Sequence, residues 1–266
     1  IMFSSLTKNG ASETIRALNL GAFDFIEKPN NPILLNQKKD EIIDKIKFAY
    51  QHKLKRRITT LQRPQNASPS LNNRVDTIRT STMFNPPTQQ SSAATPTAVK
   101  NIILIGCSTG GPRALKEIMP MFPRNLNGAI LIVQHMPKGD YTRSLSETLN
   151  RVSPLQVQEA QNGQQLQNGN VYIAPGGYQM KINASGSIII VEDPPESGHA
   201  PSVDYMFREL FNRKGRYRLL PIVLTGMGGD GSKSSLLFSN AGIETVVESE
   251  QSCVVFGMPK KVIEIG

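Results

Sequence analysis

Short apolar runs alternate with amphipathic segments along residues 100–266. The runs "NIILIG", "GAILIVQH" and "LLPIVLTG" lack polar alternation, which is typical of strands buried on both faces. Apolar side chains at helical spacing predict helices over about 112–119, 140–152, 202–214 and 232–242. Buried strands that alternate with helices predict an α/β fold: a doubly wound, mostly parallel sheet with helices on both faces.

Two further runs, 169–175 and 187–193, predict strands joined through 176–186 as a hairpin. The runs "ETVVES" and "CVVFG" close the chain. No internal repeat is visible.

The first 57 residues predict strand, helix, strand and helix. "IMFSS" and "FDFIEKP" are the strands, 11–22 is the first helix, and a basic amphipathic helix runs from about Pro32 to Arg57. This order is that of the second half of a small doubly wound domain. The opening also lacks the layout of a signal peptide, so we expect a fragment that begins inside a domain.

Residues 58–99 are rich in Pro, Ser, Thr, Asn and Gln and have almost no periodic apolar pattern. Such a segment cannot bury enough surface to offset its ordering entropy, so a flexible linker is predicted. The domains expected are therefore 1–57, the linker 58–99 and a larger domain over 100–266.

The net charge of +9 is localised rather than general. Residues 36–57 carry eight basic and three acidic side chains, and 58–101 carry four and one, whereas 102–266 are nearly balanced. With 6% aromatic residues and no Trp, base-stacking platforms are not indicated. A solvated basic helix and linker explain the charge better than a nucleic-acid partner.

Two cysteines are too few for a disulfide framework, and no apolar stretch is long enough to span a membrane. A cytoplasmic, reducing location is the expectation.

Three reactive side chains follow predicted strands: Ser108, His135 and Asp230. In a parallel sheet the carboxyl ends of the strands share one edge, so these residues are expected to converge there. A serine needs an imidazole to take its proton and a carboxylate to orient that imidazole, which makes the three a candidate triad. The amides of Thr109 and Gly110, and that of Met136, are the hypothetical oxyanion donors.

Each member has a competing interpretation. Ser108 can instead cap the helix that Pro112 begins, and Asp230 in "GMGGDG" can be a turn residue. His199 lies in the polar loop "SGHAPS", and His52 lies on the basic helix. Asp204 and Cys107 are not expected to take part in catalysis. Asp204 is expected in the first turn of a helix, where it complements the helix dipole, and Cys107 is expected to be a small buried strand residue.

A phosphate-binding loop fits "GCSTGG" less well. No Lys follows the glycines, and Ser108 occupies the middle-glycine position of the dinucleotide fingerprint. A nucleotide-binding module on a Rossmann-like sheet stays the second hypothesis, and a docking piece without turnover the third.

Six segments together resemble the chemotaxis protein-glutamate methylesterases (CheB): "GCSTGGPRAL", "IVQHMPKGDYTRSL", "NGNVYIAPGGYQM", "GHAPSVDYMF", "VLTGMGGDG" and "SCVVFGMPKKVIE". The resemblance implies a serine esterase that demethylates glutamyl methyl esters on chemoreceptors and deamidates receptor glutamines, with no metal or organic cofactor. It places the nucleophile on Ser108, the base on His135 and the orienting acid on Asp230, with Met227 lining the pocket.

The opening segment is similar to the end of the family's response-regulator receiver domain. There Ser4 and Lys28 match positions that contact a phosphoryl group, while the phospho-accepting aspartate is expected upstream. The resemblance implies as partners the methyl-accepting receptors and, through an intact receiver, the histidine kinase. It also implies a catalytic domain that continues beyond Gly266. Gln179 and Ala200 depart from the family's usual residues.

Overall fold

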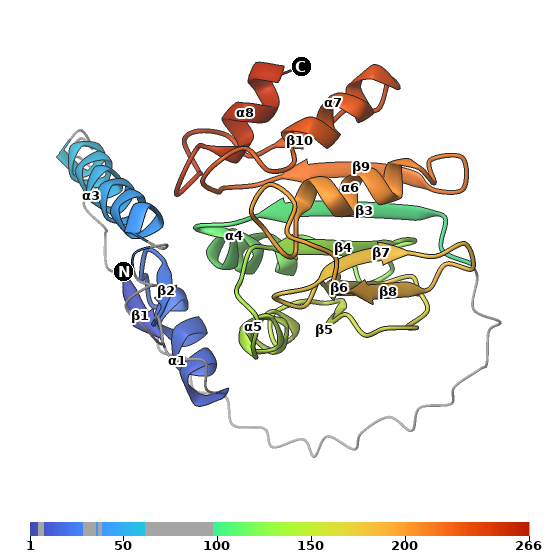
Figure 1. The fold of residues 1–266 in the computed structure, drawn as a ribbon, viewed down its shortest axis with the longest axis horizontal. Coiled ribbons are helices and arrows are strands. Elements are labelled where there is room, and N and C mark those ends of the chain that lie inside the picture. Colours follow the sequence, from blue (N-terminus) through green and yellow to red (C-terminus); the bar gives the residue numbers. More distant parts are fainter. Residues whose placement is uncertain (5–7, 29–35, 37–38, 62–97, 266) are drawn as a thin grey trace, which may run out of the picture.

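The structure is a computed structural model that describes residues 1–4, 8–28, 36, 39–61 and 98–265, with the backbone alone for 8–9 and 52–61. We call 98–265 the sheet unit and the other described residues the N-terminal segment. The sheet unit is built on a six-stranded, all-parallel sheet of order β10-β9-β3-β4-β6-β5 (Figure 1). The strands are β3 (Asn101–Cys107), β4 (Ala129–Gln134), β5 (Gln156–Glu159), β6 (Asn170–Ile173), β9 (Arg218–Val223) and β10 (Val246–Val247).

Helices cover both faces of this sheet. One face packs on α6 (Val203–Phe211), α7 (Ser232–Asn240) and α8 (Met258–Ile265), with Leu104, Leu131 and Phe207 at its centre. The other packs on α4 (Gly111–Ile118) and α5 (Tyr141–Asn150), and a short 3₁₀ turn, Met119–Met121, follows α4. The predicted fold class is therefore confirmed, because the buried apolar strands are sealed on both sides.

The predicted hairpin was wrong in its pairing. The first of its two strands, β6, lies inside the parallel sheet beside β4. The second, β8 (Ile188–Val191), pairs antiparallel with β7 (Gln179–Ile182), which belongs to the stretch expected to be the connection. Apolar character located the strands, but pairing depends on which edge is free, and that is a tertiary property.

Strand β5 and helix α8 were missed. The pattern of β5, "QVQE", has one buried apolar side chain, too little to predict a strand. At the other end, "CVVFG" forms no strand and α8 follows it. In the N-terminal segment α3 (Lys39–Leu61) extends past the predicted end, so residues 58–61 are helical and not linker. The predicted linker over 62–97 and the predicted helix start at Pro32 lie outside the described residues.

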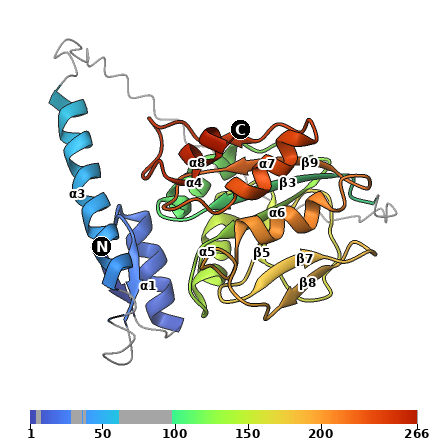
Figure 2. The same cartoon turned by 45° about the horizontal axis from the view of Figure 1, so that its top comes forward.

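The rest of the N-terminal segment consists of parallel strands β1 (Met2–Ser4) and β2 (Phe25–Glu27) with α1 (Lys8–Asn19). It lies beyond the carboxyl ends of the sheet strands, beside α4 and α5 (Figures 1 and 2). Ala11, Ile15 and Leu18 of α1 join the apolar cluster on that face. The ring of Phe25 stacks on Tyr141 with centroids 4.9 Å apart. The segment is thus packed against the edge at which the candidate triad was expected.

Candidate active site

The three candidate residues follow three adjacent strands of the sheet. Ser108 comes directly after β3, His135 directly after β4, and Asp230 ends the loop between β9 and α7. Backbone hydrogen bonds continue past the strand ends: Ser108 N donates to Thr225 O at 3.0 Å, and His135 N to Cys107 O at 3.0 Å. The edge holds these side chains where the strand order reverses, which is the usual ligand site of such sheets.

Ser108 lies on a sharp turn from strand to helix. Gly110, with φ 86°, is the N-cap of α4, and no side chain caps that helix. The capping interpretation of Ser108 is therefore wrong. Gln134 fixes the turn, because its Nε2 donates to Ser108 O at 3.0 Å and to His135 O at 3.1 Å.

The two glycines of the turn are required by packing. A Cβ on Gly110 would lie 2.5 Å from Cβ of Val254, and one on Gly111 would lie 2.0 Å from Oε1 of Gln134. The close approach of neighbouring side chains therefore leaves no room for a Cβ at either position.

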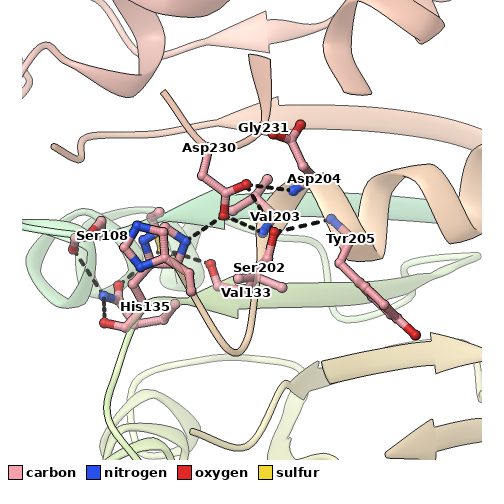
Figure 3. A network of polar contacts seen from close by, with 12 residues as sticks. Ser108, Val133, His135, Ser202, Val203, Asp204, Tyr205, Asp230 and Gly231 are labelled. Carbon is pink, nitrogen blue, oxygen red and sulfur yellow. Dashed lines mark hydrogen bonds and ion pairs between the residues drawn. The ribbon is translucent and has the colours of Figure 1, made fainter. Parts of the chain in front are cut away.

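Asp230 holds His135 and is itself held by the start of α6 (Figure 3). His135 Nε2 lies 2.8 Å from Asp230 Oδ2. The amides of Val203 and Asp204 donate to this carboxylate at 2.7 and 2.9 Å, and Ser202 Oγ donates at 3.0 Å. Burial by itself would raise the pKa of Asp230, but the hydrogen bond and charge of His135 and the amides lower it to about 2. The acid stays ionised behind the imidazole.

Ser108 and His135 line the same cavity of about 440 Å³, together with Thr109, Met136 and Met227. Ser108 is half-buried, and in the described part of the chain its Oγ makes no hydrogen bond. His135 Nδ1 is buried and also lacks a partner there. Ser108 and His135 therefore line one cavity, each with a polar atom that has no partner among the described residues, and catalytic hydrogen bonds commonly tighten only with substrate.

Three backbone amides close in sequence to Ser108 and His135 are candidates for oxyanion donors. Across the described residues, the N–H groups of Thr109, Gly110 and Met136 have no hydrogen-bond acceptor, and Thr109 and Met136 line the cavity. Thr109 and Gly110 precede the N-terminus of α4, where the helix dipole favours negative charge. The arrangement can stabilise an oxyanion next to Ser108.

The competing residues are placed elsewhere. Burial raises the pKa of the Cys107 thiol far above neutrality, so it is packing rather than a nucleophile. Asp204 is in the first turn of α6, as predicted, but it is buried and accepts from Ser234 N and Oγ of α7, both at 2.8 Å. The side chain of His52 lies outside the described residues.

His199 is the site residue that the sequence analysis set aside. Its ring stacks on that of His135, with centroids 3.8 Å apart and planes 14° apart. Burial first, and then the neighbouring His135, lower the pKa of His199 to about 4, so its ring is neutral at pH 7. The pattern "PSVD" next to His199 indicates a helix N-cap, but it does not show that this loop lies against His135. That contact is formed only in the folded chain.

The N-terminal segment forms the other wall of the cavity. Asp24 Oδ2 accepts from Thr109 Oγ1 at 2.5 Å and lies 3.1 Å from Lys45 Nζ. Burial by itself would lower the pKa of Lys45, but Asp24 and Glu41 raise it. Ser4 is buried and bonds to Thr14 Oγ1 at 2.5 Å, while Lys28 is exposed and donates its amide to Ser4 O.

No three His, Cys, Asp or Glu side chains in the described part of the chain are grouped so as to hold a metal ion. No described helix is both long and apolar enough to cross a bilayer.

Comparison with known proteins identifies the family. Residues 103–266 match the family model for CheB methylesterase. The protein-glutamate methylesterase/protein-glutamine glutaminase of Symbiobacterium thermophilum is 38% identical over 268 residues, which is 100% of this chain and 71% of that protein. The protein of that name from Bacillus licheniformis is 40% identical over 272 residues, 100% of this chain and 72% of the relative.

The chain belongs to the CheB methylesterase family. The solved catalytic domain of the Thermotoga maritima CheB methylesterase is 38% identical, with a TM-score of 0.59 over 63% of this chain and 89% of that one. The family and the fold predicted from the sequence are both confirmed. Two residues were noted above as differing from the family's usual residues. Ala200 lines the cavity, and Gln179 is fully buried.

Proposed function

We propose that Ser108, His135 and Asp230 carry the methylesterase reaction of this CheB protein. The observation that carries the proposal is the 2.8 Å bond between His135 and a buried, ionised Asp230, in a cavity that also holds a free Ser108 hydroxyl. The protein is an esterase of chemotactic adaptation that converts glutamyl methyl esters of methyl-accepting chemoreceptors to glutamates.

The bond to Asp230 occupies Nε2 of His135, so Nδ1 is the nitrogen that takes the proton of Ser108. Ser108 Oγ attacks the ester carbonyl, and the amides of Thr109, Gly110 and Met136 stabilise the oxyanion. His135 then returns the proton to the leaving methoxide, and methanol departs.

Water hydrolyses the acyl-enzyme by the same route and leaves a glutamate carboxylate. A glutamine side chain would follow the same path with ammonia as the leaving group. Met227 lines the cavity beside the acyl group.

The N-terminal segment is proposed to be part of a receiver domain, in which Ser4 and Lys28 lie at positions that contact a phosphoryl group. Its place against the cavity supports a role in restricting access to Ser108. The proposal also includes a cytoplasmic location. The protein would act on methyl-accepting chemoreceptors and, through an intact receiver, contact the histidine kinase.

The test is methanol release from membranes that carry methylated chemoreceptor. Ser108→Ala should lower the rate by at least about 10³-fold, because the nucleophile is lost. Ser146→Ala is the matched control, since among the described residues the Ser146 hydroxyl bonds within α5 alone, to Arg143 O at 2.7 Å. A Ser108→Ala protein with the wild-type rate would refute the triad. Thermal stabilisation by a dinucleotide would then favour the nucleotide-binding alternative.

A further inference from the structure

Within the described part of the chain, the hydrogen bonds of the buried Gln179 side-chain amide all go to one segment, 194–202. Gln179 begins β7 and is 0% exposed. Its Nε2 donates to His199 O at 3.0 Å and to Pro194 O at 3.4 Å, and its Oε1 accepts from Ser202 N at 2.9 Å. Both sides of the amide are used, so the side chain fixes the path of residues 194–202.

This segment makes two contacts with the proposed triad. At one end the His199 ring lies flat on His135, at 3.8 Å between centroids. At the other end Ser202 Oγ donates to Asp230 Oδ1 at 3.0 Å and caps α6, whose first amides hold the same carboxylate. Gln179 binds the backbone at both points without touching His135 or Asp230 itself.

We propose that Gln179 is a positioning residue for ester hydrolysis, which acts by holding His199 in its stack on His135. The inference rests on the proposed triad. Within the described residues the His199 ring makes no hydrogen bond, so it acts on His135 by contact and not by proton transfer. The stacked ring restricts rotation of the imidazole and excludes water from one of its faces.

Charged groups of both parts of the molecule lie near this stack. His135 and Asp230 face His199 from the sheet unit, and Lys45 faces it from α3. Asp24, Glu27, Glu41 and Asp44 line the same cavity. A variant that removes the stack gives the His135 ring rotational freedom, so kcat should fall while KM stays nearly unchanged.

The first test compares Gln179→Leu with Gln164→Leu in the full chain, by methanol release from methylated receptor membranes. Gln164 is a matched control because its amide also donates (to Gln158 Oε1, 2.9 Å) and accepts (from Gln161 N, 3.1 Å), away from the cavity. Gln179→Leu should lower kcat roughly tenfold or more, with KM within about threefold, since a small misplacement of catalytic groups is costly. Gln164→Leu should leave both kcat and KM unchanged.

The second test asks whether Gln179 acts through the stacked ring of His199. His199→Phe keeps a flat ring over His135 and should retain kcat within about threefold, whereas His199→Ala should behave like Gln179→Leu. The kcat of the double variant Gln179→Leu/His199→Ala should lie within about twofold of that of the slower single variant. The two changes remove the same interaction, so their effects should not add.

Full kcat in Gln179→Leu, with only a lower Tm, would show a purely structural residue and overturn the proposal. If that variant does not fold, Gln179→Glu keeps the acceptor for Ser202 N and loses the donor to His199 O, and the same comparison of kcat with KM decides. Failure of the triad is recognised separately, because Ser108→Ala would then stay active. An inactive Ser108→Ala beside fully active Gln179→Leu and His199→Ala variants would refute this inference alone.

Discussion

The carboxylate of Asp230 shows how single residues define this site. Four donors converge on its two oxygens: the His135 imidazole, the Ser202 hydroxyl and the amides of Val203 and Asp204. A buried carboxylate is costly unless it is paired, and here each donor favours the ionised form. The hydrogen bonds that keep Asp230 ionised also hold its carboxylate in place, and the carboxylate in turn orients the His135 ring.

At this scale Asp230→Asn should lower the rate of methanol release by about 10³- to 10⁴-fold, because the amide no longer holds the imidazole in the reactive tautomer. Glu159→Gln, a carboxylate bonded to Thr142 at 2.6 Å outside the cavity, is the control and should keep the wild-type rate. An Asp230→Asn enzyme with normal turnover would remove this residue from the triad.

Asp230 also makes stability depend on pH. Its folded pKa, about 2, lies below the ordinary value of about 3.9. Its stabilising contribution is therefore present above about pH 4 and is lost as pH falls towards 2. In urea unfolding, the stability difference between wild type and Asp230→Asn should narrow over that interval. A difference that stays constant from pH 5 to pH 2 would contradict the lowered pKa.

At the scale of elements, β3, the turn at Ser108 and α4 form one unit. The strand is buried, the turn requires two glycines, and Pro112 follows at the start of the helix. These are local signals, which is why this unit was predicted almost to the residue. The hairpin β7–β8 was not, because its pairing depends on the antiparallel contact of segments that lie outside the main sheet.

Gly111→Ala tests the turn. Its Cβ would lie 2.0 Å from Gln134 Oε1 and 2.9 Å from Cys107 Sγ, so Gln134 must release Ser108 O or the helix must move. We expect a loss of about 1–3 kcal/mol in the free energy of unfolding, measured in urea, and a lower kcat.

Gly215→Ala is the control for that change, because a Cβ there would meet nothing within 4 Å. Equal stability of the two alanine variants would show that the turn tolerates a side chain.

At the scale of the whole molecule, the cavity of the proposed triad is shared between the sheet unit and the N-terminal segment. Asp24, bonded to Thr109 and Lys45, lies next to the turn at Ser108, and the apolar face of α1 packs beside α4 and α5. Under the proposed function, a receptor side chain would have to reach Ser108 past this wall, and the contact would restrict access.

Asp24→Ala should therefore raise kcat/KM for methylated receptor membranes. Loss of a charge-assisted hydrogen bond of about 1.5–3 kcal/mol would favour release of the segment from Thr109 by roughly 10- to 150-fold at most. Glu13→Ala, at an exposed pair with Arg16 at 3.8 Å, should change nothing, because such pairs contribute little. A kcat/KM that stays the same or falls in Asp24→Ala would show that this contact does not limit access.

The sequence by itself determined the parallel α/β sheet, the strand ends that carry Ser108, His135 and Asp230, and the CheB resemblance, because these depend on local apolar pattern and turn chemistry. The tertiary structure alone decided that His199 stacks on His135, that Gln179 holds this loop, and that Asp24 reaches Thr109. Those contacts join residues far apart in the chain. Their partners are set by how loops pack above the sheet edge, which no local pattern specifies.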